Sequence, residues 1–419
     1  MKIKRHILCI LTAIFATVAG AQSSDSVFVQ KMRDVGVTFS HNNSVTLLTS
    51  GQEKFDDMFA AIRQAKSSVH LEYFNFRDDS IANALFDILA EKASQGVEVR
   101  ALHDAFGNAS NNQPLRKKQI EYQRSRGIQI YEYDPLRFPW ITRIFHRDHR
   151  KIVIIDGEIA YTGGMNVADY YIHGTEVVGS WHDMHCRLQG DEVRTLQDIF
   201  IRIWNKVTDE ELTDGKYYGA GTTFADLKPD TTATAGHKMV GIVNREPVVT
   251  NKIMRQFYIN ALDCAKDSVK LLNPYFTLVG SVRRAINRAI DRGVKVELMI
   301  AKISDIPLTP DCAFYNMHKF MKRGADVWIN EDGFHHTKII MVDGKYCTVG
   351  SCNLDARSLR WDYEANAVII DKNTTAELSR HFDRNKSNSF YLTEEKWDEW
   401  RTPWQKFRGR IGRLIAFWL

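Results

Sequence analysis

The chain has 419 residues, of which 44% are hydrophobic and 26% are charged, and these values are typical of a folded protein with two domains of ordinary size. The formal net charge is +5, but Lys2, Lys4 and Arg5 lie in a segment that we expect to be removed, which leaves 53 basic against 51 acidic side chains. A nearly neutral chain lacks the overall basic charge that favours nucleic-acid binding, so we expect no nucleic-acid partner.

The first 21 residues predict a signal peptide. The basic start is followed by a short apolar run over residues 7–18, and Ala19-Gly20-Ala21 fits a cleavage site. The run is shorter than the roughly 20 residues that a membrane-spanning helix needs. We therefore expect an exported protein, and an uncleaved membrane anchor is the alternative.

The next elements alternate between strand and helix. Residues 69–76 are apolar and aromatic and predict a strand, and residues 81–94 have the apolar spacing of a helix. Gly96 fits the position just past the end of that helix, and residues 97–102 predict a second strand. This order, which continues as β-α-β-α-β-β, predicts a layered α/β domain.

The order of elements occurs twice. Residues 95–99 (Gln-Gly-Val-Glu-Val) match residues 292–296 (Arg-Gly-Val-Lys-Val), and residues 126–128 match residues 323–325 at the same separation. Such a repeat predicts a duplicated domain. We place the domains at residues 22–217 and 239–395, joined by a linker at 218–238 that is rich in Gly, Thr and Ala, and followed by a basic and aromatic tail at 396–419.

Each half carries one H-x-K-x4-D motif. The first contains His149, Lys151 and Asp156, and the second has the same form. The β-branched residues of the motif predict a strand, on which residues two apart point to the same face. A histidine and a lysine that project together form a poor core but a good phosphate-binding pair. The corresponding residues of the second motif are His336, Lys338 and Asp343.

The two motif aspartates are expected at turns. Asp156 is seven residues from His149, which strict alternation places on the opposite face, and it precedes Gly157. Asp-Gly between two apolar runs is typical of a hairpin turn, and Asp343 also precedes a glycine. We interpret both aspartates as partly structural, and direct proton transfer by them is the weaker hypothesis.

A second group of polar and small residues follows each motif. Gly164 and Ser351 are small enough to let a substrate approach the backbone, and the amides of Asn166 and Asn353 can donate to a phosphoryl oxygen. Two carboxylates farther along are candidates for holding a catalytic histidine through its Nδ1 proton. These carboxylates are Asp183 and Glu364.

Histidines at i, i+3 spacing raise the question of a metal. His146 and His149 have this spacing, as do His182 and His185, but no cysteine or carboxylate set completes a site. We therefore expect no metal and no cofactor.

With these residues the chain resembles the phospholipase D superfamily and, within it, bacterial cardiolipin synthases. The resemblance extends from about residue 45 to residue 371 and includes Leu71-Glu72-Tyr73-Phe74, Asn273-Pro274-Tyr275-Phe276 and residues 351–358. It implies duplicated α/β/α sandwich domains with mixed sheets and one active site at a pseudo-twofold interface. It also implies transfer of a phosphatidyl group from one phosphatidylglycerol to another, which gives cardiolipin and glycerol.

The resemblance also implies roles for the site residues. One histidine attacks the phosphorus and forms a phosphohistidine; by analogy with the family this is His149, while His336 acts as general acid and base. The near-symmetric motifs themselves leave these two roles open. The charge on the phosphoryl oxygens would be stabilised by Lys151, Lys338, Asn166 and Asn353.

The motifs leave the acceptor open as well. A hydrolase of the same superfamily uses the same covalent intermediate with water as acceptor, and it would act on phospholipid and less readily on nucleic acid. A catalytically inactive lipid-binding protein is the third hypothesis, which the complete His and Lys sets of both motifs disfavour.

Many cardiolipin synthases carry two N-terminal membrane-spanning helices, whereas this sequence shows only a short signal-like run there, so we expect no integral membrane anchoring. Its tail mixes aromatic, aliphatic and basic residues such as Trp404, Phe407 and Arg408, which favours peripheral contact with an anionic membrane surface. Docking of the tail on the protein's own surface is the alternative. Residues 136–141 could admit lipid beside the active site or pack as an ordinary loop. We expect a monomer with a pseudo-dimeric repeat, although the sequence does not determine the oligomeric state.

Overall fold

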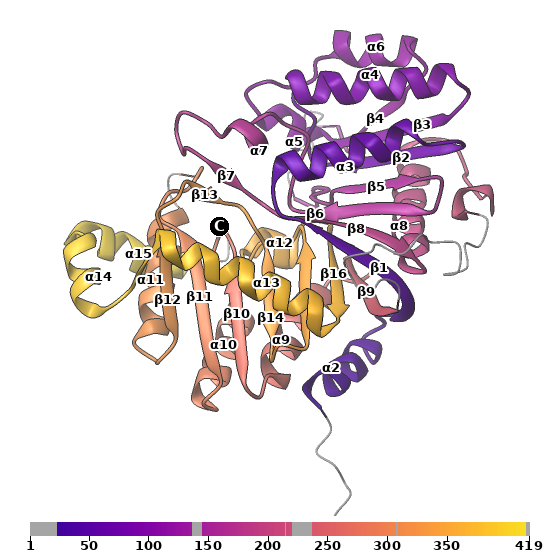
Figure 1. Cartoon of the computed structure of the whole chain (residues 1–419). Coiled ribbons are helices and arrows are strands. Elements are labelled where there is room, and N and C mark those ends of the chain that lie inside the picture. Colours follow the sequence, from indigo (N-terminus) through magenta and orange to yellow (C-terminus); the bar gives the residue numbers. More distant parts are fainter. Residues whose placement is uncertain (1–22, 136–144, 214, 220–236, 307–308, 416–419) are drawn as a thin grey trace, which may run out of the picture.

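A computed structural model describes residues 23–135, 145–213, 215–219, 237–306 and 309–415 of the chain (Figure 1). The predicted signal peptide, the loop at residues 136–141 and most of the predicted linker lie outside the described residues.

The described strands form one mixed sheet that runs through both halves of the chain. Its order is β17-β12-β11-β10-β14-β15-β16-β9-β1-β8-β6-β5-β2-β3-β4. The strands of the first half are β1 (Ser40–Leu48), β2 (Ser68–Tyr73), β3 (Glu98–Asp104), β4 (Gln129–Tyr133), β5 (Ile152–Ile155), β6 (Ile159–Gly163) and β8 (His185–Gly190). Those of the second half are β9 (Lys238–Arg245), β10 (Ser268–Leu272), β11 (Lys295–Ala301), β12 (Asp326–Asn330), β14 (Ile339–Val342), β15 (Tyr346–Gly350), β16 (Glu364–Ile370) and β17 (Ser389–Tyr391).

The strand order repeats about a pseudo-twofold axis between β1 and β9. In the first half β2, β3 and β4 are parallel while β5, β6 and β8 are antiparallel, and β10 to β12 and β14 to β16 repeat this pattern. The two equivalent strands β1 and β9 pair with each other antiparallel, with Ser40 opposite Val240. The predicted duplication into mixed-sheet domains is therefore confirmed, and the halves share one sheet.

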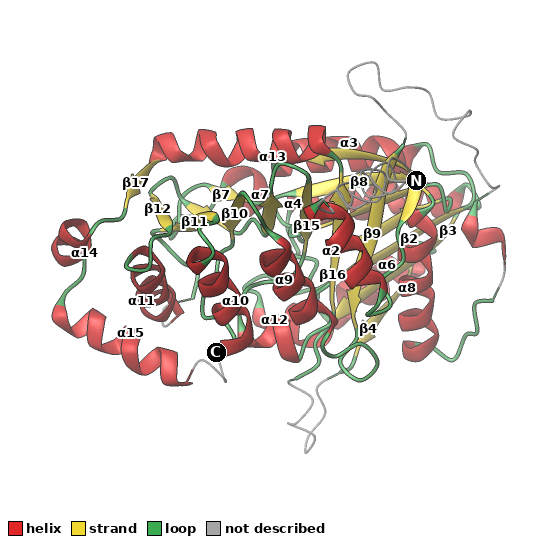
Figure 2. Cartoon of the chain, turned by 90° about the horizontal axis from the view of Figure 1, so that it is seen from below, coloured by secondary structure: helices red, strands yellow, loops and turns green. Residues whose placement is uncertain are grey.

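Helices cover both faces of the sheet. The first half carries α3 (Gly51–Arg63), α4 (Ser80–Ser94), α5 (Ala105–Ser110), α6 (Lys117–Ser125), α7 (Tyr170–His173) and α8 (Glu192–Val207), after α2 (Ser24–Arg33). The second carries α9 (Ile253–Cys264), α10 (Gly280–Asp291), α11 (Thr309–Met321), α12 (Ala356–Arg360), α13 (Lys372–Asn385), α14 (Glu394–Trp400) and α15 (Pro403–Ile415), and short 3-10 turns lie at Gly215–Tyr218 and Lys386–Asn388. Figure 2 shows α13 on one side of the second half and α9, α10 and α11 on the other.

Helix boundaries follow local capping chemistry. The α4 helix starts where the Asp79 carboxylate accepts a hydrogen bond from the backbone N–H of Ala82. It ends before Gly96, whose φ of 90° is costly for residues other than glycine. The predicted helix over residues 81–94 is thus confirmed almost to its ends.

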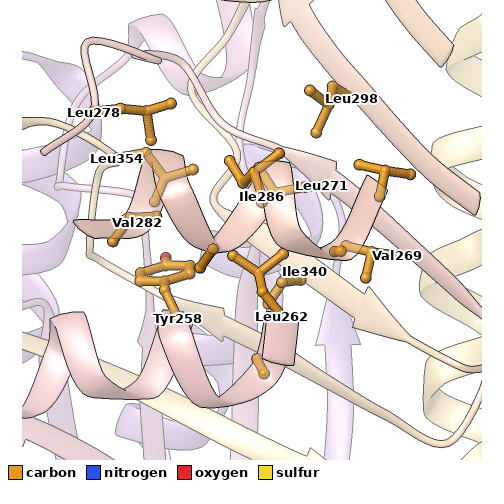
Figure 3. Packing of buried hydrophobic residues seen from close by; sticks show 14 of the residues in the cluster. Tyr258, Leu262, Val269, Leu271, Leu278, Val282, Ile286, Leu298, Ile340 and Leu354 are labelled. Carbon is orange, nitrogen blue, oxygen red and sulfur yellow. The ribbon is translucent and has the colours of Figure 1, made fainter. Parts of the chain in front are cut away.

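Among the described residues, three large apolar clusters hold the layers together, and a small fourth one contains Val178, Tyr275, Ala301 and Phe334. Each half has one cluster that lies mainly within it. Figure 3 shows part of the cluster of the second half, where Ile286 of α10 and Leu262 of α9 pack over the strands that carry Leu271 and Ile340. The third cluster joins residues of both halves, such as Leu188 of β8 and Ile242 of β9. Because apolar burial is the main stabilising term in folding, this shared core holds the two halves in fixed relation.

Candidate active site

The motif histidines lie just outside the sheet, where each half pairs with the other. The strand prediction for the motifs is wrong in extent, because β5 begins at Ile152 and β14 at Ile339, each after its motif lysine. The backbone before the strand instead crosses to the opposite half. The N–H of His149 donates to the carbonyl of Tyr363 at 3.1 Å. The N–H of His336 donates to the carbonyl of His182 at 2.7 Å.

A short parallel pair of strands supports the second of these crossings. β13 (Phe334–His335) pairs with β7 (Trp181–His182), and both lie between the two halves (Figure 1). On the other side of the pseudo-twofold axis, a single parallel bridge joins Asp148 to Tyr363. The main chain of each histidine is therefore fixed by hydrogen bonds from the other half.

The side chains cross between the halves in the same way. His149 Nδ1 lies 3.0 Å from a carboxylate oxygen of Glu364, and His336 Nδ1 lies 2.7 Å from one of Asp183. Both carboxylates are fully buried. A carboxylate at this position favours the tautomer with the proton on Nδ1, which leaves Nε2 to act on a substrate.

The motif lysines lie behind the histidines and are buried. Lys151 Nζ donates to the carbonyl of His149 at 2.5 Å, and Lys338 Nζ donates to the carbonyl of His336 and lies 3.8 Å from Asp183. Burial lowers the pKa of Lys151 to about 7 and that of Lys338 to about 8. The lysines therefore supply positive charge that is sensitive to pH near neutrality.

Burial and the neighbouring lysines also favour neutral imidazoles. Desolvation, followed by the charge of Lys338, lowers the pKa of His336 to about 4, and desolvation and Lys151 lower the pKa of His149 well below its usual range. Burial raises the pKa of Glu364 to about 7. A neutral imidazole can attack a phosphorus atom or accept a proton, whereas protonation of a leaving group requires an imidazole that already carries the extra proton.

Both histidines open onto one cavity of about 390 Å³, which Asn166 and Asn353 also line. Aromatic residues from both halves form much of its wall, namely Phe74, Phe106, Tyr170, Trp181 and Tyr275. Charged residues that also line it are Asp305, Asp355, Arg357 and Asp362. The cavity thus offers a polar floor for a phosphate and an aromatic wall for a less polar group.

Gly164 and Ser351 are placed differently from the sequence-based expectation that they admit substrate. A Cβ atom on Gly164 would lie 2.2 Å from the Asp183 carboxylate, and the Ser351 hydroxyl donates to Glu364. Neither is among the residues that line the cavity. Both instead position the carboxylates that hold the histidines, because a small residue is needed where a buried carboxylate meets the backbone.

The two motif aspartates lie at the far ends of β5 and β14, outside the cavity lining. Asp156 and Asp343 have φ values of 55° and 52° in tight turns, so the predicted turn positions are confirmed. Each carboxylate accepts backbone hydrogen bonds from the segment before the next strand, at residues 66–68 and 266–268. This geometry favours the structural interpretation over proton transfer.

A buried ion-pair network around the first motif was not anticipated from the sequence. Arg147 Nε lies 3.0 Å from both carboxylate oxygens of Asp104. Arg150 Nε lies 2.6 Å from a carboxylate oxygen of Glu72 and 3.1 Å from one of Asp148. The only signal in the sequence is the density of charge beside His149. It does not reveal which partners are brought close by folding.

The histidine pairs at i, i+3 spacing do not converge on a common centre. His182 stacks on His335 with ring centroids 4.4 Å apart, whereas His185 Nδ1 accepts a hydrogen bond from the N–H of Met165. Within the described ranges, no three His, Cys, Asp or Glu side chains are grouped as metal ligands. No helix in that part of the chain is long and apolar enough to cross a membrane.

Known proteins are similar in sequence to this chain over most of its length. A family model described as "Cardiolipin synthase, PLD-like domain" matches residues 58–204 and 258–386. The cardiolipin synthase of Oceanobacillus iheyensis is 33% identical over 94% of this chain and 79% of its own length, and that of Listeria monocytogenes is 32% identical over 94% and 78%.

A solved structure of similar fold is the phosphatidylserine synthase of Haemophilus influenzae. It has a TM-score of 0.70, covers 94% of this chain and all of that one, and is 15% identical in sequence, so it supports the fold alone. Together with the paired histidine motifs at one cavity, the family match shows that the chain belongs to the cardiolipin synthase family with phospholipase D-like domains.

Proposed function

We propose that the protein is a phosphatidyltransferase that moves a phosphatidyl group from one phosphatidylglycerol to a second, giving cardiolipin and glycerol. The observation that carries this proposal is the pair of imidazoles held across the interface with their Nε2 atoms free for one cavity. The names of the similar cardiolipin synthases point to the same reaction.

In the first step, Nε2 of His149 attacks the phosphorus and a P–N bond forms. The P–O bond to glycerol breaks, and His336 gives its proton to the departing oxygen. His336 needs a proton for this step, and the anionic phosphodiester beside it raises its pKa when the substrate binds.

In the second step, His336 takes the proton of a hydroxyl on the second phosphatidylglycerol. That oxygen attacks the phosphorus, the P–N bond breaks, and cardiolipin leaves. Lys151, Lys338, Asn166 and Asn353 stabilise the negative charge of the phosphoryl oxygens in both steps. No metal or other cofactor enters this scheme.

The substrate is a membrane lipid, so we place the enzyme at the surface of a membrane of the bacterial cell envelope. Export by residues 1–21 and the division into domains at residues 22–217 and 239–395 belong to the same proposal. The pseudo-dimeric repeat supplies both histidines from one chain, which makes a monomer sufficient for catalysis.

The test is product analysis with the full-length protein. Phosphatidylglycerol in mixed detergent micelles is incubated with the enzyme, and the lipids are measured by mass spectrometry. Equal amounts of cardiolipin and glycerol are expected. Phosphatidic acid as the sole lipid product would instead identify a hydrolase.

The histidine roles are tested by trapping. With phosphatidylglycerol labelled in its phosphate, we expect His336→Ala to retain an acid-labile protein label and His149→Ala to retain none. The opposite pattern would exchange the two roles, and label on both variants would refute a single nucleophile.

A further inference from the structure

The α15 helix docks on the protein through glycines. A Cβ atom on Gly409 would lie 2.4 Å from the carbonyl oxygen of Asp311, and one on Gly412 would lie 3.0 Å from the Cβ of Cys312. Both neighbours belong to α11. Both glycines of α15 therefore lie on the face that packs against α11.

The opposite face of α15 presents large apolar side chains to solvent. Trp404, Phe407 and Ile411 are 63%, 50% and 43% exposed and follow the i, i+3, i+7 spacing of one helical stripe. The rings of Trp404 and Phe407 stack with centroids 5.5 Å apart. We call these three residues the α15 stripe. Docking of the tail on the protein and exposure of an apolar surface are thus compatible, because they use opposite faces of the same helix.

Positive charge surrounds the α15 stripe. The helix contains no acidic residue, and its basic residues are Lys406, Arg408, Arg410 and Arg413. Arg283 of α10 lies close enough to Arg413 for their repulsion to contribute to its lowered pKa, and Arg284 stands beside it. Two of the helix's cations are paired, Lys406 with Asp398 and Arg408 with Asp311. In the ranges that the structure describes, Arg410, Arg413, Arg283 and Arg284 form no ion pair. A helix whose charged side chains are all basic and which exposes aromatic residues between them matches a surface that is anionic outside and apolar beneath.

The α15 helix lies on the same side of the second half as α12, which lines the active-site cavity. In Figure 2, α15 and α12 both lie along the lower side of the second half, and Arg357 and Ser358 of α12 line the cavity. Ile306, which is 41% exposed and also lines the cavity, lies three residues before the start of α11, on which α15 packs.

We infer that the α15 stripe and its surrounding cations form a docking surface for an anionic lipid bilayer. Trp404 and Phe407 enter the boundary between headgroups and acyl chains, and the arginines contact lipid phosphates. A second copy of the chain would have to bring its own cations against these arginines, which charge repulsion opposes. The inference rests on the proposed function only for the lipid substrate, since the docking itself requires no turnover.

Vesicle sedimentation of the full-length protein tests the inference. Wild type is compared with Trp404→Ser/Phe407→Ser and with a control, Val248→Ser/Val249→Ser, which changes two apolar residues that are 83% and 77% exposed elsewhere. Vesicles contain phosphatidylcholine alone or with phosphatidylglycerol. We expect the stripe variant to bind phosphatidylglycerol vesicles about tenfold or more weakly than wild type, and the control to match wild type.

Several results would overturn the inference. These are unchanged binding of the stripe variant, an equal loss in the control, and equal binding of wild type to both vesicle types at low salt. Light scattering adds another: a lipid-free dimer that the stripe variant abolishes would identify a second copy as the occupant.

Turnover separates this inference from the proposed function. The stripe variant should cleave monomeric short-chain phosphatidylglycerol at the wild-type rate, because the stripe is not among the residues that line the cavity. A loss of this rate would contradict a pure docking role. If wild type makes no cardiolipin but still binds vesicles through the stripe, the proposed function fails and the docking surface stands.

Discussion

Replacing Asp183 by asparagine would preserve the size of the side chain and remove the charge that holds His336. The carboxylate lies 2.7 Å from His336 Nδ1 and 3.8 Å from Lys338 Nζ, and it is fully buried. An amide can present its NH₂ group to Nδ1, which favours the tautomer that carries the proton on Nε2. An imidazole in that tautomer cannot accept a proton from the acceptor hydroxyl.

The size of the effect follows from these two contacts. A wrong tautomer in a comparable histidine–carboxylate pair lowers kcat by about 10⁴-fold, which corresponds to roughly 5 kcal/mol of transition-state stabilisation. Lys338 also loses its nearest anion, so its pKa falls below the wild-type value of about 8. We therefore expect Asp183→Asn to lower kcat by about 10²- to 10⁴-fold and to move the alkaline loss of activity to lower pH.

The assay is the initial rate of cardiolipin formation between about pH 6 and about pH 9, with thermal unfolding measured on the same samples. Asp332→Asn is the matched control, because Asp332 is partly exposed and lies 3.4 Å from His182 rather than beside a motif histidine. A folded Asp183→Asn variant with kcat within about threefold of wild type would refute the proposed role of the carboxylate.

Three further predictions concern the turn residue Asp343, the contact of Gly164 with Asp183, and the protonation of the motif lysines. Asp343→Ala should lower the free energy of unfolding in urea by about 1–3 kcal/mol and leave kcat unchanged, because its carboxylate accepts three backbone N–H groups far from the cavity. Since the pKa of Asp343 is lowered in the folded state, this stabilisation is present above its unfolded pKa of about 4 and is lost as the pH falls. Gly164→Ala should lower kcat at least about 10²-fold in the cardiolipin assay, because the added methyl group displaces the carboxylate of Asp183. An unchanged kcat would contradict this, since it would show that the carboxylate can move without loss of activity. Wild-type kcat should fall as the pH rises through about 7 and about 8, because Lys151 and Lys338 lose their protons there. Stability in urea should rise between about pH 8 and the unfolded pKa of about 10.4, since the unfolded lysines bind their protons more tightly.

The duplicated fold could be predicted because its signals are local. The glycines at positions 96 and 293 end equivalent helices, and apolar runs mark equivalent strands. The turn positions of Asp156 and Asp343 could be predicted for the same reason, since Asp-Gly between apolar runs specifies a hairpin. The pairing of β1 with β9 could not, because it joins strands that are far apart in the chain.

The site could be predicted as a set of residues but not as a set of contacts. Asp183 and Glu364 were identified as partners for histidines, yet nothing in the sequence shows that each carboxylate serves the histidine of the other half. The contact of Gly164 with Asp183 could not be predicted either, because it depends on how two segments meet in space. Contacts of this kind are set by tertiary packing, which residue type and spacing do not encode.

Each half supplies the carboxylate that holds the motif histidine of the other half, so the two halves act as one mechanical unit. A ligand that wedged the halves apart would separate His149 from Glu364 and His336 from Asp183 at the same moment. Partial opening would therefore leave no half-active enzyme that cleaves a lipid without completing the transfer. An inhibitor aimed at the seam between the halves, rather than at the phosphate-binding floor, would switch off both chemical steps together.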